Sequence, residues 1–481
     1  MCILVNTTTP WFSNDVSSCN IARTFKHILG EILEKPYLKL SNLNLITEEE
    51  KSWLAAWNAP IPKQRAICIH TSILQNCSKG PQKPAVSAWD GNFTYGDLDE
   101  LSGRLALYLR TLKLPPGTII PLFFEKTKWA IVAVLGVLRA GAAYVIVDPA
   151  SPISRTMSIC KDVDAEVMVC SNTCLHLANK LVAQVIAVEE AVKYDNISQH
   201  AELDDILVKL TDPVYAVFTS GSTGRPKGVV IEHGGFFKRA MANGPTLSLS
   251  DESRILQFAS FVFDVANRDI LYTLLYGGCI CMPSESQRSN DLALFMNQQR
   301  VNWASITPST SRILEPSKLP FLKTLVLCGE PMNASLVAKW ADRLRLINAY
   351  GPSEATTISC MATVTSSSKA MNIGKGSGSV LWIVDPDDHD RLAPLGAVGE
   401  LVIESPSVGR GYLNRPLESA ASFLTTTSWL SQFRNEPSCS LLYKTGDLAH
   451  YDADGTILFA GRKDGQIKIN GQRVDVGEIE H

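Results

Sequence analysis

The sequence predicts an α/β fold in which buried, mostly parallel strands are joined through helices. Its 481 residues are 45% hydrophobic, enough for about two or three packed units with large cores. From residue 93 onward, short apolar runs alternate with segments of helical periodicity. This alternation is typical of strands buried on both faces of a parallel sheet. After about residue 375 the helical segments become rare, which predicts a smaller β-rich part.

The extended runs share a high content of branched apolar residues and a length of four to six residues. They are expected at Ile119–Phe124, Ala143–Val147, Glu166–Cys170, Gln184–Val188, Tyr215–Thr219, Ile255–Ala259, Cys279–Met282, Trp303–Thr307, Thr324–Cys328 and Leu346–Ala349.

In the β-rich part, Val380–Val384 and Glu400–Ile403 are further expected strands. Two hairpins are predicted to turn at Asp454-Gly455 and Asn470-Gly471, because Asp-Gly and Asn-Gly favour tight hairpin turns. At the other end of the chain, residues 20–35 predict an amphipathic helix that ends before Pro36.

Composition narrows the function classes. The formal net charge is −3 and no Lys/Arg block occurs, so neither nucleic acid nor an anionic membrane is expected as the main partner. The start of the chain has no basic segment before an apolar run, and the apolar stretch 129–147 is broken by Arg139 and Gly141. The 12 cysteines stand singly. We therefore expect a reduced, cytoplasmic protein.

The stretch Phe218–Gly228, FTSGSTGRPKG, is the strongest chemical signal in the chain. A predicted buried strand leads into a loop rich in glycine and hydroxyl residues. Glycines allow close approach to a ligand, and hydroxyls and loop N–H groups can surround phosphate oxygens. Alternatively, this stretch is a flexible, solvated turn that binds no ligand. The candidate phosphate-binding residues are Thr219, Ser220, Gly221, Ser222, Thr223, Gly224 and Lys227.

This run resembles the phosphate loop of the adenylate-forming superfamily, which covers acyl-CoA synthetases, luciferases and the adenylation domains of nonribosomal peptide synthetases. Further family-like segments follow in the family's order. They are FTYGDLDELSGRLALYL, LRAGAAYVIVDPASP, NAYGPSE, GELVIESPSVGRGYLNRP, YKTGDL and GRKDGQIKINGQRVDVG. The resemblance implies a large core of stacked, mostly parallel sheets and a smaller subdomain like a distorted β-barrel.

The resemblance also implies four parts of the chain. Residues 1–58 resemble the seam between a condensation and an adenylation domain, although an ordinary N-terminal helix and arm explain them equally well. The core is expected at 59–375 and the β-rich subdomain at 376–463. Residues 464–481 would hold the hinge at Asp464 and the start of a C-terminal lid. The chain stops at His481, so the lid and its lysine are expected to be absent and turnover by this polypeptide alone to be impaired.

The family resemblance implies nucleotide contacts for individual residues of this chain. Tyr350 would stack on adenine, Ser353 would touch the α-phosphate, and Glu354 would bind Mg²⁺, a cation that prefers oxygen ligands. Asp447 would accept the ribose hydroxyls, as acids do in dinucleotide-binding folds. The remaining ATP contacts would be Asn348, Ala349, Gly351 and Arg462, and the catalytic residues Lys227, Glu354 and Thr223.

The pair Phe263-Asp264 resembles the FD pair of amino-acid-activating domains, in which the aspartate binds the α-ammonium of the substrate. Arg268, at i+4, offers a different reading, a simple ion pair with Asp264 on one helix face. Arg268 also departs from the neutral residue usual there; it would recognise a polar or acidic side chain or point away from the pocket. The expected pocket is Asp264, Val265, Arg268, Ser305, Val326, Cys328, Ala349, Thr357 and Ile358.

The favoured function is amino-acid adenylation, from ATP and an amino acid to aminoacyl-AMP and pyrophosphate, for nonribosomal synthesis of a secondary metabolite. Carrier-protein and condensation domains would be its partners, the phosphopantetheinyl carrier being supplied in trans or by a longer protein. The alternatives are a freestanding acyl- or aryl-acid CoA ligase and a lidless nucleotide-binding protein without turnover.

Overall fold

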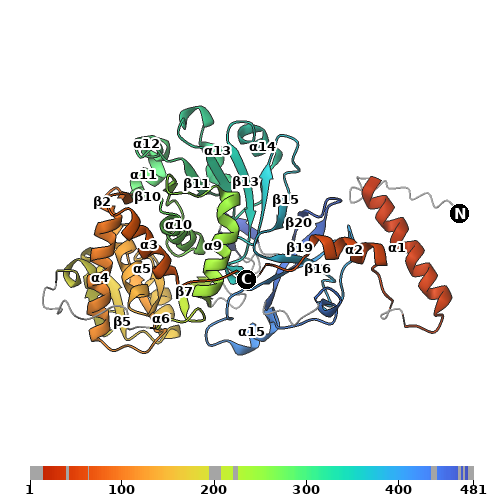
Figure 1. The fold of residues 1–481 in the computed structure, drawn as a ribbon, viewed down its shortest axis with the longest axis horizontal. Helices are drawn as coiled ribbons and strands as arrows, with labels where there is room; N and C mark the ends of the chain where they lie inside the picture. Colours follow the sequence, from red (N-terminus) through yellow and green to blue (C-terminus); the bar gives the residue numbers. More distant parts are fainter. Residues whose placement is uncertain are drawn as a thin grey trace.

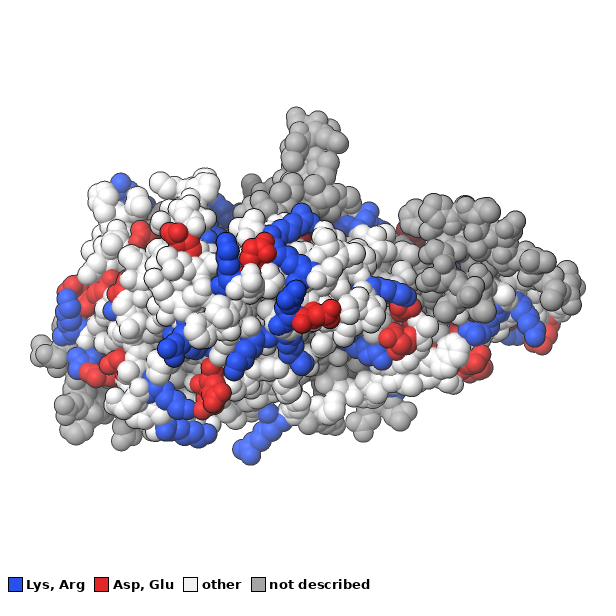
Figure 2. Space-filling model, turned by 90° about the horizontal axis from the view of Figure 1, so that it is seen from above, with Lys and Arg blue, Asp and Glu red and all other residues white. Residues whose placement is uncertain are grey.

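The computed structural model (Figure 1) describes residues 15–39, 43–62, 64–193, 207–219, 226–434, 441–463, 467–469 and 472–474. Within these ranges no helix combines the length and apolar character needed to cross a bilayer. Basic and acidic side chains are interspersed over the face shown in Figure 2. The phosphate-loop residues 220–225, the predicted hinge residue Asp464 and the segment 475–481 lie outside the described residues.

The first of two large sheets has six strands in the order β6-β5-β3-β4-β7-β8. Neighbours are parallel except β7 and β8, which run antiparallel. Four of the strands are buried along their whole length or all but one end, as continuous apolar runs predict. The six strands of this sheet are β3 (Ile119–Phe123), β4 (Ala143–Val147), β5 (Val167–Cys170), β6 (Gln184–Ala187), β7 (Pro213–Thr219) and β8 (Lys227–Glu232); the four buried ones are β3, β4, β5 and β7.

The second sheet has 14 strands in the order β16-β17-β19-β20-β15-β14-β13-β12-β11-β9-β10-β1-β2, with β18 beside β19. From β1 to β13 the neighbours are parallel, and beyond β13 they are antiparallel. The strands of its parallel part, with β2, are β1 (Pro84–Ala88), β2 (Gly91–Thr94), β9 (Arg254–Leu256), β10 (Cys279–Met282), β11 (Trp303–Ile306), β12 (Thr324–Leu327) and β13 (Arg345–Tyr350).

One hydrophobic core joins both sheets through helices packed between and beside them (Figure 1). Helix α5 is buried over nine consecutive residues, Ala130 to Leu138, which is why its sequence is apolar all round rather than amphipathic. The helices of this core are α3 (Ile69–Lys79), α4 (Tyr95–Thr111), α5 (Lys128–Arg139), α9 (His233–Leu247) and α10 (Asp264–Leu275).

The outer faces of the sheets carry separate clusters. Trp340, with no exposed surface, anchors the cluster outside the second sheet. Short helices and 3-10 turns cover these outer faces: α6 (Ile153–Asp162), α7 (Leu175–Ala178), α11 (Glu285–Asn290), α12 (Leu292–Gln298), α13 (Pro308–Ile313), α14 (Ala334–Trp340), η2 (Asn172–Cys174) and η4 (Pro316–Lys318). The short helix α8 (Val188–Ala191) instead contributes to the core between the sheets, and the turn η5 (Ser353–Ala355) follows β13.

The β-rich part continues the second sheet, and its described strands do not close a barrel. β15 pairs with both β14 and β20, so the strands of the expected distorted barrel-like subdomain continue the second sheet. The hairpin turn at Asp454-Gly455 is confirmed, with a positive φ of 77° at Gly455. The turn of the hairpin β21–β22 lies outside the described residues.

The elements of this part are β14 (Cys360–Val364), β15 (Asn372–Gly376), β16 (Val380–Val384), β17 (Gly399–Ser405), β18 (Phe423–Leu424), β19 (Leu441–Tyr451), β20 (Ile457–Arg462), β21 (Ile467–Ile469), β22 (Gln472–Val474), α15 (Pro416–Ser422) and η6 (Leu430–Gln432).

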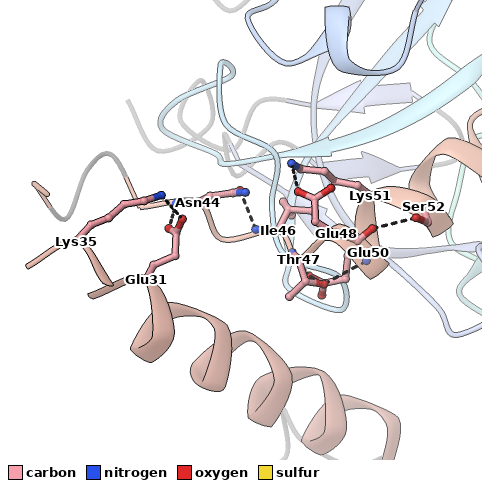
Figure 3. Close-up of polar contacts among 9 residues, drawn as sticks. All are labelled: Glu31, Lys35, Asn44, Ile46, Thr47, Glu48, Glu50, Lys51 and Ser52. Carbon is pink, nitrogen blue, oxygen red and sulfur yellow. Dashed lines mark hydrogen bonds and ion pairs between the residues drawn. The ribbon is translucent and has the colours of Figure 1, made fainter. Parts of the chain in front are cut away.

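The N-terminal arm consists of α1 (Asp15–Glu34), which stands apart from the body in Figure 1, and α2 (Glu48–Trp57). Figure 3 shows its polar contacts: the backbone N–H of Asn44 donates to Glu31 at 2.8 Å, and Thr47 and Glu50 form a capping box at the start of α2. Helix α2 is fixed to the β-rich part, because Asn58 after its end donates to the buried hydroxyl of Tyr451 at 2.8 Å.

Candidate functional site

The phosphate loop is bounded by an antiparallel strand pair. Thr219, the last residue of β7, is in register with Lys227, the first residue of β8. Ser220, Gly221, Ser222, Thr223 and Gly224 lie between them, outside the described residues. The Lys227 ammonium lies 5.2 Å from the ring centroid of Tyr412, a cation–π contact. The hairpin therefore brings the lysine and the ends of the loop to one place.

Three nucleotide candidates from distant strands meet around one carboxylate. Asp447 on β19 is in register with Arg462 on β20, and the guanidinium Nη1 donates to Asp447 Oδ1 at 2.8 Å. The hydroxyl of Tyr350, at the end of β13, donates to Asp447 Oδ2. Burial, followed by the neighbouring Asp447 charge, raises the pKa of Tyr350 well above its usual value, so the hydroxyl stays a donor. Asp447 itself is 5% exposed.

The turn after β13 is tightly built. A Cβ on Gly351 would lie 2.2 Å from the carbonyl oxygen of Thr357, so only glycine fits there. Thr356 and Thr357 both have positive φ, 60° and 67°, a conformation that costs free energy for β-branched residues and often marks a functional site. Asn348, by contrast, is bound within the sheet: its side chain donates to the carbonyl of Asn372 at 2.8 Å.

Glu354 is a suitable single ligand for Mg²⁺. It is 4% exposed, and its Oε1 accepts a hydrogen bond from the Tyr412 hydroxyl at 3.0 Å. The part of the chain that the structure describes contains no group of three or more His, Cys, Asp or Glu placed to hold a metal. Mg²⁺ commonly binds through one or two carboxylates with substrate phosphates and water, and one buried carboxylate close to β8, the strand that follows the phosphate loop in the chain, fits that pattern.

Asp264 is the first residue of α10 and follows Phe263 at the N-cap position. It is 8% exposed, and burial is the main cause that raises its pKa, while a hydrogen bond from Ser353 and the charge of Arg268 act in the opposite direction. A buried carboxylate is costly unless a cation meets it. Asp264 is therefore suited to receive an ammonium group.

Arg268 does not form the predicted i,i+4 ion pair with Asp264. Its Nε and Nη2 donate to Asp269 Oδ1 at 3.1 and 2.7 Å, and both side chains are 1% exposed. Arg268 acts on Asp264 only as a nearby charge that lowers the pKa of its carboxyl. The predicted ion pair between Asp264 and Arg268 is therefore not formed, because the adjacent residue on the helix, Asp269, takes the place of Asp264.

The other pocket candidates come together on one sheet face against α10. Ser305 on β11 is in register with Val326 on β12, and its hydroxyl lies 3.5 Å from the Cys328 thiol. Ala349 on β13 and Ile358 after the strained turn join the same core cluster as Val326. Thr357 is buried and Val265 is half-buried. Sequence reasoning omitted Asp269 and Tyr412; the only signal for Asp269 was its position next to Arg268.

Comparisons with known proteins agree with this geometry. The sequence pattern of the family described as "AMP-binding enzyme" matches residues 73–413. Nonribosomal peptide synthetase lenA of Aspergillus lentulus is 41% identical over 469 residues, 97% of this chain and 10% of that protein. N-benzoylphenylalaninol synthetase apmA of Penicillium brevicompactum is 43% identical over 467 residues, 96% of this chain and 19% of that protein. The chain thus spans a tenth to a fifth of these two relatives.

Among solved structures, PA1221, described as a nonribosomal peptide synthetase protein containing adenylation and PCP domains, superposes with a TM-score of 0.75 at 26% identity. The match covers 89% of this chain and 84% of that one. The AMPPNP-bound form of the synthetase FmoA3 has a TM-score of 0.79 at 22% identity and covers 94% of this chain and 49% of that one; it supports the fold. Given the match over residues 73–413 and the shared fold, the chain belongs to the family of AMP-binding enzymes.

Proposed function

We propose that this chain is an amino-acid adenylation domain, which joins an amino acid to AMP and releases pyrophosphate. The observation that carries the proposal is the buried Asp264 at the start of α10, the helix that lies against the sheet face of the pocket residues; Asp264 is also beside Ser353 of the nucleotide turn. A substrate with an α-ammonium would meet Asp264 and place its carboxylate toward the phosphate loop. A plain acid would leave this buried carboxylate without a cation.

The chemistry requires little acid–base catalysis. An amino-acid carboxylate is ionised at neutral pH, so it can attack the α-phosphorus of ATP, and the bond to pyrophosphate breaks. Catalysis then depends on positioning and on stabilising charge at the phosphoryl oxygens. We assign phosphate contacts to Thr223, the loop amides and Lys227, and ribose contacts to Asp447 and Arg462. When bound at Glu354, Mg²⁺ would offset negative charge on the phosphates.

Asp447 already accepts hydrogen bonds on both oxygens, from Tyr350 and Arg462. Each carboxylate oxygen has a second lone pair, so ribose hydroxyls can be accepted without breaking these contacts. The Tyr350 hydroxyl bond also fixes the ring, which the proposal places against adenine. The two neighbours therefore orient the acceptor that the ribose would meet.

Matched ligands test the substrate class. Phenylalanine and 3-phenylpropionate, or any other amino acid and its deaminated analogue, are compared pairwise in thermal unfolding with ATP present. We expect only the amino acid of a suitable pair to stabilise the chain, because the deaminated form leaves Asp264 unpaired. Equal stabilisation by both members of every pair would favour an acyl- or aryl-acid ligase.

We further propose carrier-protein and condensation domains as partners. PA1221 contains adenylation and PCP domains, and the synthetase relatives are several times longer than this chain. Helix α1 offers a surface for such a neighbour: Phe25, Leu29 and Leu33 are 51%, 43% and 73% exposed. Replacing Leu29 and Leu33 with serine should leave the unfolding temperature unchanged and weaken binding to a separately produced condensation domain of a nonribosomal peptide synthetase. Unchanged binding would exclude α1 from the interface.

A further inference from the structure

Helix α10 carries, near the pocket candidates, a buried charged side chain whose charge is already compensated. Arg268 lies one helical turn after Asp264, so both project from the same face of α10. Its guanidinium carbon lies 5.9 Å from the ring centroid of Trp303. Trp303 precedes Ser305 by two residues on β11 and therefore faces the same side of the sheet. The guanidinium thus lies among the residues that would surround a substrate side chain.

The hydrogen bonds of this guanidinium are incomplete. Nε and Nη2 are bound to Asp269, whereas Nη1 is buried and has no hydrogen-bond partner. Asp269 Oδ2 is likewise buried without a partner. Buried polar groups in folded proteins nearly always have partners, and an unpaired N–H that a ligand seals from water is costly. The ion pair on α10 therefore keeps one free donor, Arg268 Nη1, and one free acceptor, Asp269 Oδ2.

Charge decides which kind of side chain fits. Asp269 neutralises Arg268, and an α-ammonium would neutralise Asp264. Lys126 is a further cation near Asp269; its ammonium is bound to the backbone carbonyls of Gln257 and Phe258, and burial lowers its pKa to about 7, so it carries only part of a charge at neutral pH. An acidic substrate side chain would bring an unpaired negative charge into this buried site, which is unfavourable. A hydrocarbon would leave Nη1 without an acceptor.

We propose that the pocket selects a neutral amino acid whose side chain carries a carboxamide or a similar carbonyl group, received by Arg268 Nη1. This inference rests on the proposed adenylation function and specifies its substrate class. A carboxamide is neutral and carries its acceptor and its donor on two separate atoms, as the unpaired Arg268 Nη1 and Asp269 Oδ2 require. Arg268 acts as a specificity residue, and Asp269 positions it and sets its effective charge.

Aminoacyl sulfamoyl adenosines test this, because they mimic the aminoacyl adenylate and share every group except the side chain. Two sets of similar shape are titrated calorimetrically into the 481-residue chain: asparaginyl, aspartyl and leucyl, and glutaminyl and glutamyl. At the chain length that fits, the amide should bind at least about tenfold more tightly than the acid or the hydrocarbon, since sites built to hydrogen-bond a group discriminate strongly against analogues that lack it.

Two variants test whether the Arg268–Asp269 ion pair causes the preference for the amide. The double variant Arg268→Met/Asp269→Leu replaces the pair with apolar residues of similar volume, a change that buried pairs often tolerate, and should bind the leucyl conjugate at least as well as the asparaginyl one. Asp269→Asn removes the compensating charge and should shift preference from amide toward acid. Thermal unfolding and unchanged binding of 5′-sulfamoyladenosine, which lacks a side chain, verify that each variant is folded.

Equal binding of amide and hydrocarbon conjugates by the unaltered chain would overturn this inference, as would an amide preference that survives in the double variant. Tighter binding of the acid would show instead that Arg268 acts as a cation. These outcomes leave amino-acid adenylation intact. If no conjugate bound more tightly than 5′-sulfamoyladenosine, the proposed function would fail together with the inference.

Discussion

The assignment of Asp447 to the ribose can be tested by Asp447→Ala, whose effects on ATP binding and on folding are separable. The carboxylate accepts hydrogen bonds from Tyr350 and from Arg462, at 2.8 Å for the arginine. If the ribose hydroxyls also bind there, ATP loses charge-assisted hydrogen bonds, and its binding free energy should weaken by about 1–3 kcal/mol. That corresponds to roughly a five- to 150-fold increase in the dissociation constant.

The same substitution has a cost in the absence of nucleotide. The side chains of Asp447 and Arg462 are 7% and 10% exposed, and removing one member of a buried ion pair typically costs about 3–5 kcal/mol of unfolding free energy. Arg462 keeps a hydrogen bond to the carbonyl of Thr445 at 3.3 Å. The loss should therefore fall near the lower end of that range.

Calorimetric titration with ATP measures the loss of binding free energy, and urea unfolding measures the loss of unfolding free energy. Glu404→Gln is the matched control, because Arg434 and Glu404 form a buried pair in the same β-rich part, outside the nucleotide site. It should reduce stability by a similar amount and leave ATP affinity unchanged. If Asp447→Ala left ATP affinity unchanged in a folded protein, the ribose assignment would be wrong.

Three further predictions concern stability. Arg434 donates to both oxygens of Glu404, at 3.0 and 2.6 Å, so Glu404→Gln should lower the unfolding free energy by about 3–5 kcal/mol in urea unfolding. Burial lowers the pKa of His70 to about 4 and of His233 to about 3. Below about pH 6.5 the unfolded chain therefore binds more protons than the folded chain, so the free energy of unfolding should decrease from pH 6.5 toward pH 4, by on the order of 3 kcal/mol per histidine. His70→Phe should remove about half of this decrease when denaturation is measured across the same pH range. Finally, a Cβ on Gly374, whose φ is 86°, would lie 1.8 Å from a backbone oxygen of β14, so Gly374→Ala should lower the unfolding temperature by several degrees in a thermal scan.

A strand could be predicted from the sequence when its own residues show that it is buried, and could not when its position depends on distant segments. Ala143–Val147 is apolar along its length and has the predicted bounds, because only a strand between covered faces suits such a run. Strands β14 and β15 were missed. Asn372–Gly376 contains two glycines and a lysine, and its pairing with β20 depends on residues more than 80 positions later. Local patterns carry no signal for such a strand.

For the candidate site, the sequence predicted which residues take part but not how they contact one another. The sequence indicated that Tyr350, Asp447 and Arg462 belong to one site, on the strength of a family resemblance. It did not indicate that the first and third both donate to the second. That contact depends on strand register, since Asp447 and Arg462 are opposite each other only after the hairpin has formed.

Arg268 illustrates why spacing alone misled. Helical periodicity favours an i,i+4 partner, and on an exposed helix Asp264 would be the natural choice. Here α10 is buried on nearly all sides, so the guanidinium must satisfy its charge inside the core, and the adjacent Asp269 lies within 2.7 Å. The choice of partner for Arg268 also affects which substrate groups the site can bind. An arginine paired with Asp264 would have occupied the carboxylate that we propose for the substrate ammonium, whereas an arginine paired with Asp269 leaves Asp264 available and keeps Arg268 Nη1 as an unpaired donor.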